Sequence, residues 1–232
     1  DSSVIGVVGP WTSGEVRAAG PVLNKAGLTF TSPSATDPTM GRNLGWKTFF
    51  RGTVNDRQVG VSIANYLTGE RGLSKICVIG NDSSDARDLA PTVASTLKSA
   101  TAPGCTLTVT RGAQDFSEQV ATVQQVGADA VFYAGEWMEA APLVRQLRAA
   151  GVTVPFIAGA DRVFSTQFSS IAGTAASRSL LVCACGPTSG QFSTEYRERY
   201  GQAPVTFAAE AYDLTAIMLK AIDSGVDSRT GM

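Results

Sequence analysis

The side chains in this sequence that could carry chemistry are four cysteines and several loops rich in serine, threonine and aspartate. Histidine is absent from all 232 residues. This removes the serine–histidine and cysteine–histidine pairs of common nucleophilic enzymes, and also the commonest metal ligand. The glycines of Gly6-Val7-Val8-Gly9 complete neither a dinucleotide fingerprint nor a phosphate loop. The sequence therefore predicts no catalytic centre, metal site or cofactor, although carboxylate and lysine chemistry stay open.

The four cysteines are Cys77, Cys105, Cys183 and Cys185. Their spacings include no Cys-x-x-Cys pair, so a zinc site is not expected. Cys183 and Cys185 would point to the same face if they lie in a strand. Two interpretations stay open: buried thiols in a core, or one or two disulfides, which an exported protein permits. Sequence alone does not give the connectivity.

Composition limits the class of protein. The formal net charge is −1, with 44% hydrophobic and 17% charged residues. This length suits one large domain or two lobes of roughly 100 residues each. Lysine and arginine form no block, which argues against a nucleic-acid partner because phosphate binding needs a basic surface. No apolar run approaches the ~18 residues of a membrane-spanning helix.

Short apolar runs alternate with amphipathic stretches along the chain. We expect strands at residues 4–8, 28–31, 48–53, 75–80, 105–110, 130–133, 155–158 and 180–183. We expect helices at residues 16–26, 56–67, 85–100, 117–126, 138–150, 192–200 and 207–224. This alternation predicts an α/β fold with mainly parallel sheets. Loops that follow the carboxyl ends of such strands share one edge, where ligands usually bind.

One loop carries a family motif. Ser32-Pro33-Ser34-Ala35-Thr36-Asp37-Pro38 resembles the Ser-Pro-x-Ala-Thr-x-Pro segment of the leucine/isoleucine/valine-binding proteins of ABC transporters. Further family segments follow in the same order, including Asp115-Phe116-Ser117, Leu147-Arg148-Ala149-Ala150-Gly151 and Tyr212-Asp213. The resemblance covers essentially the whole chain. The sequence is identified as a member of the type I periplasmic solute-binding proteins, in the branched-chain amino acid class.

The resemblance implies a fold and a division into lobes. The fold is α/β, with two Rossmann-like lobes built on mainly parallel sheets. The first lobe is expected at residues 1–53 and 187–232, and the second at residues 54–186. The family's opening strand, loop and helix have no counterpart before Val4, and its closing strands have none after Met232. We therefore expect the first lobe to be incomplete in these residues, with more natural sequence before Asp1.

The resemblance also implies a function. The protein would be the extracytoplasmic solute-binding component of an ABC importer, either periplasmic or a cell-surface lipoprotein. As a monomer and not an enzyme, it would bind an amino acid or related small polar solute in a cleft between the lobes and deliver it to a membrane permease. Closure of the lobes would be a population shift driven by the solute. The alternative is a ligand-sensing receptor domain of the same fold.

The family positions assign roles around the zwitterion of an amino acid. Ser13 would bind the solute carboxylate through its hydroxyl and neighbouring amides at a helix start. Ser34 matches a position that gives backbone contacts, and Thr36 matches a threonine whose hydroxyl reaches the polar end of the solute. Asp161 falls where the family carries an acidic residue for the ammonium. The alternative for these hydroxyls is a turn or capping role, and Asp161 could equally cap the following helix.

Three further candidates lie in loops that follow strands. Glu136 and Trp137 follow the strand expected at 130–133, and Trp137 could pack on the side chain of the solute. Its alternative is a core position beside the next helix. Trp11, in the first loop, is a second aromatic candidate. The polar run Asp82-Ser83-Ser84-Asp85 is interpreted as a solvated helix cap, because the family has a polar turn there.

Overall fold

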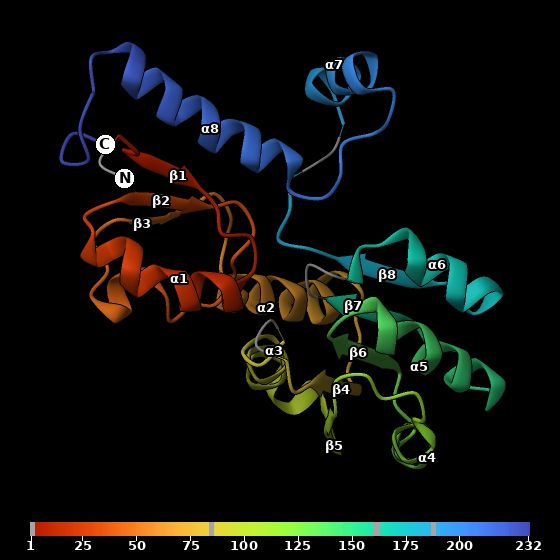
Figure 1. The fold of residues 1–232 in the computed structure, drawn as a ribbon. Helices are drawn as coiled ribbons and strands as arrows, with labels where there is room; N and C mark the ends of the chain where they lie inside the picture. The colour runs from red at the N-terminus through yellow and green to blue at the C-terminus, as the bar shows by residue number, and fades with distance from the viewer. Residues whose placement is uncertain (1–2, 84–85, 160–162, 187–188) are drawn as a thin grey trace. The chain divides into compact units, whose positions relative to one another are not determined.

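The computed structural model describes residues 3–83, 86–159, 163–186 and 189–232 (Figure 1). The chain separates into two compact units. Unit 1 comprises Asp1–Asn55 and Ala184–Met232, and unit 2 comprises Asp56–Cys183. The chain thus passes between units at 55/56 and at 183/184, where the expected lobes change at 53/54 and 186/187.

Unit 1 is built on a three-stranded parallel sheet. Its strands are β1 (Gly6–Val8), β2 (Thr29–Ser32) and β3 (Phe49–Arg51), with β2 in the centre and Phe30 opposite both Val7 and Phe49. Its helices are α1 (Ser13–Lys25), α7 (Gln191–Tyr200) and α8 (Ala208–Asp223), with a short 3-10 turn at Gly41–Leu44.

Helices α1 and α8 cover opposite faces of this sheet (Figure 1). Phe30 packs with Val16 of α1 and with Trp46 on one face. Residues alternate across a strand, so Gly6 belongs to the other face, where a Cβ would lie 3.2 Å from the sulfur of Met218 in α8. These contacts form the small core of unit 1. The loops that follow β1 and β2 begin at the carboxyl ends of these two strands.

Unit 2 has a five-stranded parallel sheet in the order β5-β4-β6-β7-β8. The strands are β4 (Ile76–Asn81), β5 (Thr101–Val109), β6 (Ala130–Ala134), β7 (Phe156–Gly159) and β8 (Ser179–Val182). The helices are α2 (Asp56–Asn65, followed by a π turn at Tyr66–Glu70), α3 (Leu89–Leu97), α4 (Ser117–Val126), α5 (Trp137–Ala149) and α6 (Thr166–Ala172). β4 and β6 are buried throughout, as expected for strands covered by helices on both faces.

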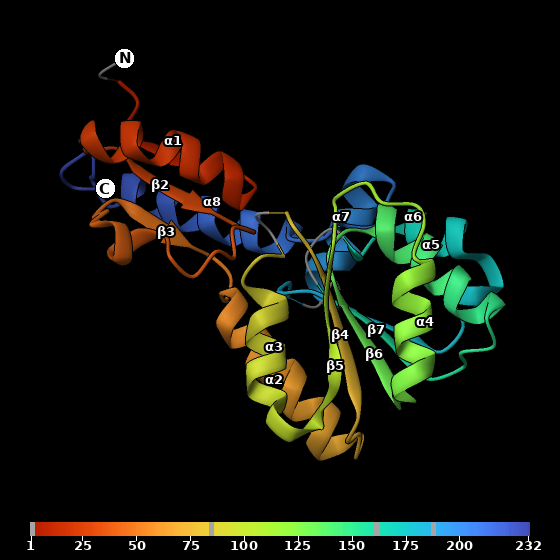
Figure 2. The same ribbon diagram turned by 90° about the horizontal axis from the view of Figure 1, so that it is seen from below.

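Helices cover both faces of this sheet. Figure 2 shows α2 and α3 on one side and α4, α5 and α6 on the other. On the α4–α6 side, Phe116, Val120 and Leu143 pack with strand residues in one large core. On the α2–α3 side the packing is close enough to require glycine, since a Cβ on Gly80 would lie 2.7 Å from that of Ala90. The predicted α/β class with parallel sheets is confirmed.

One difference in element boundaries concerns β5, which begins at Thr101 and not at the expected residue 105. Another concerns α1, which begins at Ser13 and not at the predicted Val16. The cause is a capping box. The Thr12 hydroxyl accepts a hydrogen bond from the Glu15 amide (3.2 Å), and the Glu15 carboxylate accepts one from the Thr12 amide (2.8 Å). This arrangement satisfies the first amides of the helix and adds a turn at its start.

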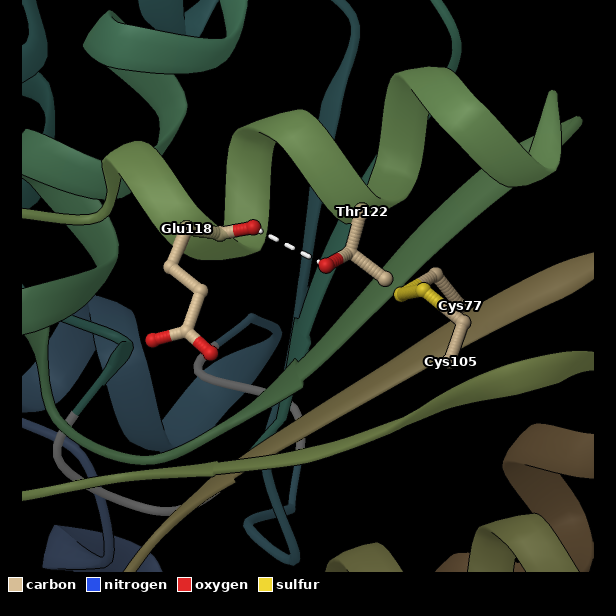
Figure 3. Close-up of a disulfide and its surroundings, with 4 residues drawn as sticks. All are labelled: Cys77, Cys105, Glu118 and Thr122. Carbon is tan, nitrogen blue, oxygen red and sulfur yellow. Dashed lines mark hydrogen bonds between the residues drawn. A yellow bond between two sulfur atoms is a disulfide. The ribbon is translucent and has the colours of Figure 1, made fainter.

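The cysteines are disulfide-bonded and not free thiols. Cys77 of β4 is bonded to Cys105 of β5, with their Cα atoms 4.9 Å apart and both residues fully buried. Figure 3 shows this disulfide beside Thr122 of α4. Cys183 and Cys185 are also disulfide-bonded. The interpretation as buried thiols is therefore wrong, and the alternative of disulfides is correct.

Candidate functional site

In unit 1, the loops after β1 and β2 are joined by hydroxyl groups. The Ser13 hydroxyl accepts hydrogen bonds from the amides of Thr36 and Asp37, at 3.2 Å each. The Ser34 hydroxyl donates to the Trp11 carbonyl at 2.7 Å. The structure thus brings together four sequence candidates, Ser13, Ser34, Thr36 and Trp11, at the carboxyl ends of two neighbouring strands. We call these four residues the hydroxyl cluster.

The hydroxyl cluster is mostly buried. Ser13, Ser34 and Thr36 are only 3%, 4% and 2% exposed, whereas Trp11 is 43% exposed. Because the Ser13 oxygen already accepts two amide hydrogen bonds, the chemistry left to it is donation of its own O–H. Trp11 is held by an edge contact with Phe207, with ring centroids 5.8 Å apart. The cluster therefore offers hydroxyl donors beside an accessible indole.

The amides next to Ser13 are partly occupied. The Trp11 and Thr12 amides both donate to the Glu15 carboxylate, at 3.1 and 2.8 Å. These two amides are therefore not available to a solute in this structure. The role expected of backbone amides around Ser13 cannot fall on them.

Charged groups brace the loop that follows β2. Arg51 donates to the carbonyls of Ala35 (2.9 Å) and Asp37 (2.8 Å). The Asp37 carboxylate forms an ion pair with Arg17 and accepts hydrogen bonds from the Thr39 hydroxyl and amide. Burial opposes ionisation of Asp37, but the hydrogen bonds from Thr39 and the charge of Arg17 outweigh it and lower its pKa. This bracing fixes the backbone that carries Ser34 and Thr36.

In unit 2, the predicted residue Glu136 lies where β6 passes into α5, at the N-cap of that helix. Its side chain is 3% exposed and forms an ion pair with Arg111, 3.0 Å from Nη2 to Oε1. Arg111 follows β5, and its side chain is 51% exposed. Trp137 begins α5 and packs, partly buried, against the core of unit 2. This contact agrees with the core alternative for at least part of its ring.

A buried polar network lies at the same sheet edge. The carboxylate of Glu139, a fully buried residue, accepts hydrogen bonds from the Gly112 amide (2.6 Å) and the Tyr133 hydroxyl (3.4 Å). Burial raises the pKa of Tyr133, and the negative charge of Glu139 raises it further. Asn81, the last residue of β4, accepts from the Ser83 hydroxyl at 2.6 Å. Tyr133 therefore acts as a neutral hydrogen-bond donor.

Arg111, Tyr133 and Glu139 were not predicted as site residues. Their positions gave one signal, since Arg111 and Tyr133 lie just after or at the end of an expected strand and Glu139 lies in the first turn of α5. Asp161, the candidate for the ammonium, lies outside the described residues. Across residues 3–83, 86–159, 163–186 and 189–232, no group of three or more cysteine, aspartate or glutamate side chains could hold a metal ion. Within those ranges, no helix combines the length and apolar character needed to cross a membrane.

Comparison with known proteins identifies the family. A family model described as "Periplasmic binding protein" matches residues 1–231. The chain is 30% identical over 212 residues to the Leu/Ile/Val-binding protein homolog 1 of Brucella suis, covering 90% of this chain and 55% of that relative. It is 30% identical over 174 residues to an amino acid binding protein of Pseudomonas aeruginosa, covering 73% of this chain and 45% of that protein. The chain thus spans about half the length of these curated relatives.

Solved structures agree with this assignment. A branched-chain amino acid transporter substrate-binding protein from Streptococcus pneumoniae, in complex with isoleucine, superposes with a TM-score of 0.82 at 29% identity. The match covers 97% of this chain and 66% of that one. A leucine-binding protein from Thermotoga maritima has the same fold, with a TM-score of 0.81 at 23% identity and coverage of 98% and 66%. From its sequence and its fold, the chain belongs to the periplasmic binding protein family.

Proposed function

We propose that this protein is the solute-binding component of an ABC importer and that it binds an amino acid or a related small polar solute. Two observations support the proposal. The family model matches residues 1–231, and its relatives include Leu/Ile/Val-binding proteins. The polar groups of each unit gather at the carboxyl ends of parallel strands, which is where open α/β sheets bind ligands.

The observation that carries the proposal is the hydroxyl cluster. An amino acid has a carboxylate that needs hydrogen-bond donors in a site largely shielded from water. Ser13 supports this role because its oxygen accepts from the amides of Thr36 and Asp37, which directs its O–H elsewhere. Thr36 supplies a second hydroxyl in the same cluster. Trp11, with its indole 43% exposed, is the surface we assign to the apolar part of the solute.

Unit 2 has its own part in this proposal. We assign the solute ammonium to Asp161, as the family position implies, and further polar contacts to the loop that carries Glu136 and Trp137. An ammonium needs acceptors, and a carboxylate is the strongest of these. Binding of this kind requires no catalytic group, so we propose a carrier and not an enzyme.

The disulfides support a location outside the cytoplasm. Cys77 and Cys105 are bonded, and Cys183 and Cys185 are in the disulfide form as well. Disulfides form and persist in oxidising compartments and are rare in the cytosol. We therefore propose an extracytoplasmic protein, periplasmic or attached to the cell surface as a lipoprotein, that acts as a monomer and delivers its solute to a membrane permease.

A thermal-shift screen of the full-length protein tests the proposal. The panel holds the twenty L-amino acids, simple amides and aromatic acids. A solute at 100 times its dissociation constant stabilises the folded state by about 2.7 kcal/mol. For a chain of this size that corresponds to a rise in Tm of roughly 5–10 °C. The absence of a shift with every member of the panel would overturn the proposal.

A further inference from the structure

Trp11 is the exposed member of the hydroxyl cluster. Tryptophan is highly buried on average, because its side chain carries a large apolar surface. Trp11 nevertheless lies in the loop between β1 and α1 with 43% of its surface exposed, while the three hydroxyl residues of the cluster are almost completely buried. An exposed indole beside these hydroxyls is a surface that a bound solute can cover.

The backbone of Trp11 is held on both sides. Its amide donates to the Glu15 carboxylate at 3.1 Å. Its carbonyl accepts hydrogen bonds from the hydroxyls of Ser32 (3.1 Å) and Ser34 (2.7 Å). These bonds come from α1, from the end of β2 and from the loop after β2, so the position of Trp11 is fixed by three segments of unit 1.

Phe207 holds the ring of Trp11. The two rings meet edge to face, with centroids 5.8 Å apart and planes at 85°. Phe207 is itself only 2% exposed, and its φ of +65° is rare for a residue with a bulky side chain. The contact restrains the indole without covering it. The loop thus presents a fixed aromatic surface, with little conformational freedom left to lose when a solute binds.

The two loops offer no exposed aliphatic side chain in place of the indole. Besides Pro10, residues 9–12 contain no apolar side chain other than Trp11. In the loop after β2, residues 33–40, the apolar side chains apart from prolines are those of Ala35 and Met40. Both are buried in the core of unit 1. The contact of these loops with the apolar part of a solute therefore depends on an aromatic ring and not on aliphatic groups.

We propose that Trp11 stacks against an aromatic ring of the solute, so that the solute class is an acid with a planar aromatic ring, such as an aromatic amino acid, and not a branched-chain amino acid. This inference rests on the proposed function, which assigns the solute carboxylate to the hydroxyl cluster. Every residue on which it depends belongs to unit 1. Aromatic pairs attract each other beyond the effect of buried area, because their quadrupoles are complementary in offset and edge-to-face arrangements. Leucine, isoleucine and valine lack that attraction.

The test is calorimetric titration of the full-length protein with an aromatic set (L-phenylalanine, L-tyrosine, L-tryptophan and 4-hydroxybenzoate) and an aliphatic set (L-leucine, L-isoleucine and L-valine). We expect at least one aromatic solute to bind more tightly than every aliphatic one. Trp11→Leu keeps an apolar side chain but removes the ring. It should weaken the preferred aromatic solute about 3- to 10-fold and change any binding of the aliphatic set less than about twofold. Trp11→Phe, which keeps a ring, should lose less.

Tyr200→Leu is the matched control, because it removes a ring that is 58% exposed at the end of α7, and it should leave the affinities unchanged. The inference is overturned if an aliphatic solute binds more tightly than the whole aromatic set. It is also overturned if Trp11→Leu weakens both sets equally or neither, or if only solutes without an aromatic ring bind. In those cases solute binding, and with it the proposed function, still stands. Failure of every solute here and in the wider screen would instead refute the proposed function itself.

Discussion

The disulfide between Cys77 and Cys105 should contribute a large share of the stability of unit 2. The two residues are separated by 28 positions and join the neighbouring strands β4 and β5 inside the core. In the chain-entropy model, a cross-link that closes a loop of this size lowers the entropy of the unfolded chain enough to stabilise the folded state by about 3.5 kcal/mol at 25 °C. The double change Cys77→Ala/Cys105→Ala should remove that contribution.

Urea unfolding measures this loss. At an m-value of about 2–3 kcal/mol/M, a loss of 3.5 kcal/mol lowers the midpoint by about 1–2 M. Reduction of the parent protein with dithiothreitol should lower its midpoint by a similar amount, and the same treatment should change the double variant much less. A variant that unfolds at the midpoint of the parent would contradict this contribution of the disulfide. Free thiols detected in the unfolded, unreduced parent would contradict the disulfide itself.

Three further predictions concern unit 1. Ser13→Ala should weaken solute binding about tenfold, because a hydroxyl donor is lost; calorimetry should show no such loss for the exposed Ser169→Ala, and equal affinity in both would remove Ser13 from the site. Gly20→Ala should destabilise the protein by about 1–3 kcal/mol in chemical unfolding, because its Cβ would lie 2.4 Å from the Trp46 ring; unchanged stability would contradict the packing. The pKa of Asp37 is lower in the folded protein than in the unfolded chain. Ionised Asp37 therefore stabilises the folded state fully at pH values above its pKa in the unfolded chain, and this stabilisation is lost as the pH falls through its lower pKa in the folded state. Asp37→Asn should therefore flatten the decline in unfolding free energy in acid, and an unchanged decline would refute the role of this carboxylate.

The fold could be predicted where hydrophobic pattern and helix signals agree. Helix α4 was expected at residues 117–126, and it spans Ser117–Val126, ended by Gly127 in a left-handed conformation. β4 was expected because its apolar run indicates burial on both faces, and the structure buries every residue from Ile76 to Asn81. Such local signals do not depend on the partner of the element, which is why sequence alone was sufficient.

Features that depend on strand order could not be predicted. Arg111 and Glu136 are 25 positions apart in sequence and follow β5 and β6, which are separated by β4 in the sheet. The pairing of Cys77 with Cys105 likewise needs the adjacency of β4 and β5. Sequence pattern identifies strands but does not give their order, so these contacts emerge only in three dimensions.

The candidate site could be predicted only in part from the sequence. Family motifs placed Ser13, Ser34 and Thr36 in loops after strands, and the structure brings them together through hydrogen bonds between the two loops. Their contact with a solute stays a prediction. The capping box of Thr12 and Glu15 was missed, although both residues are visible in the sequence, and it changes which amides around Ser13 are available.

Equilibrium dialysis of the full-length protein against labelled amino acids and simple amides tests whether the protein binds a small polar solute. We predict saturable binding of at least one of them, with one molecule bound per protein molecule and displacement by the unlabelled solute. Retention of no solute above the level of a non-binding control protein, at protein concentrations sufficient to detect weak binding, would contradict it.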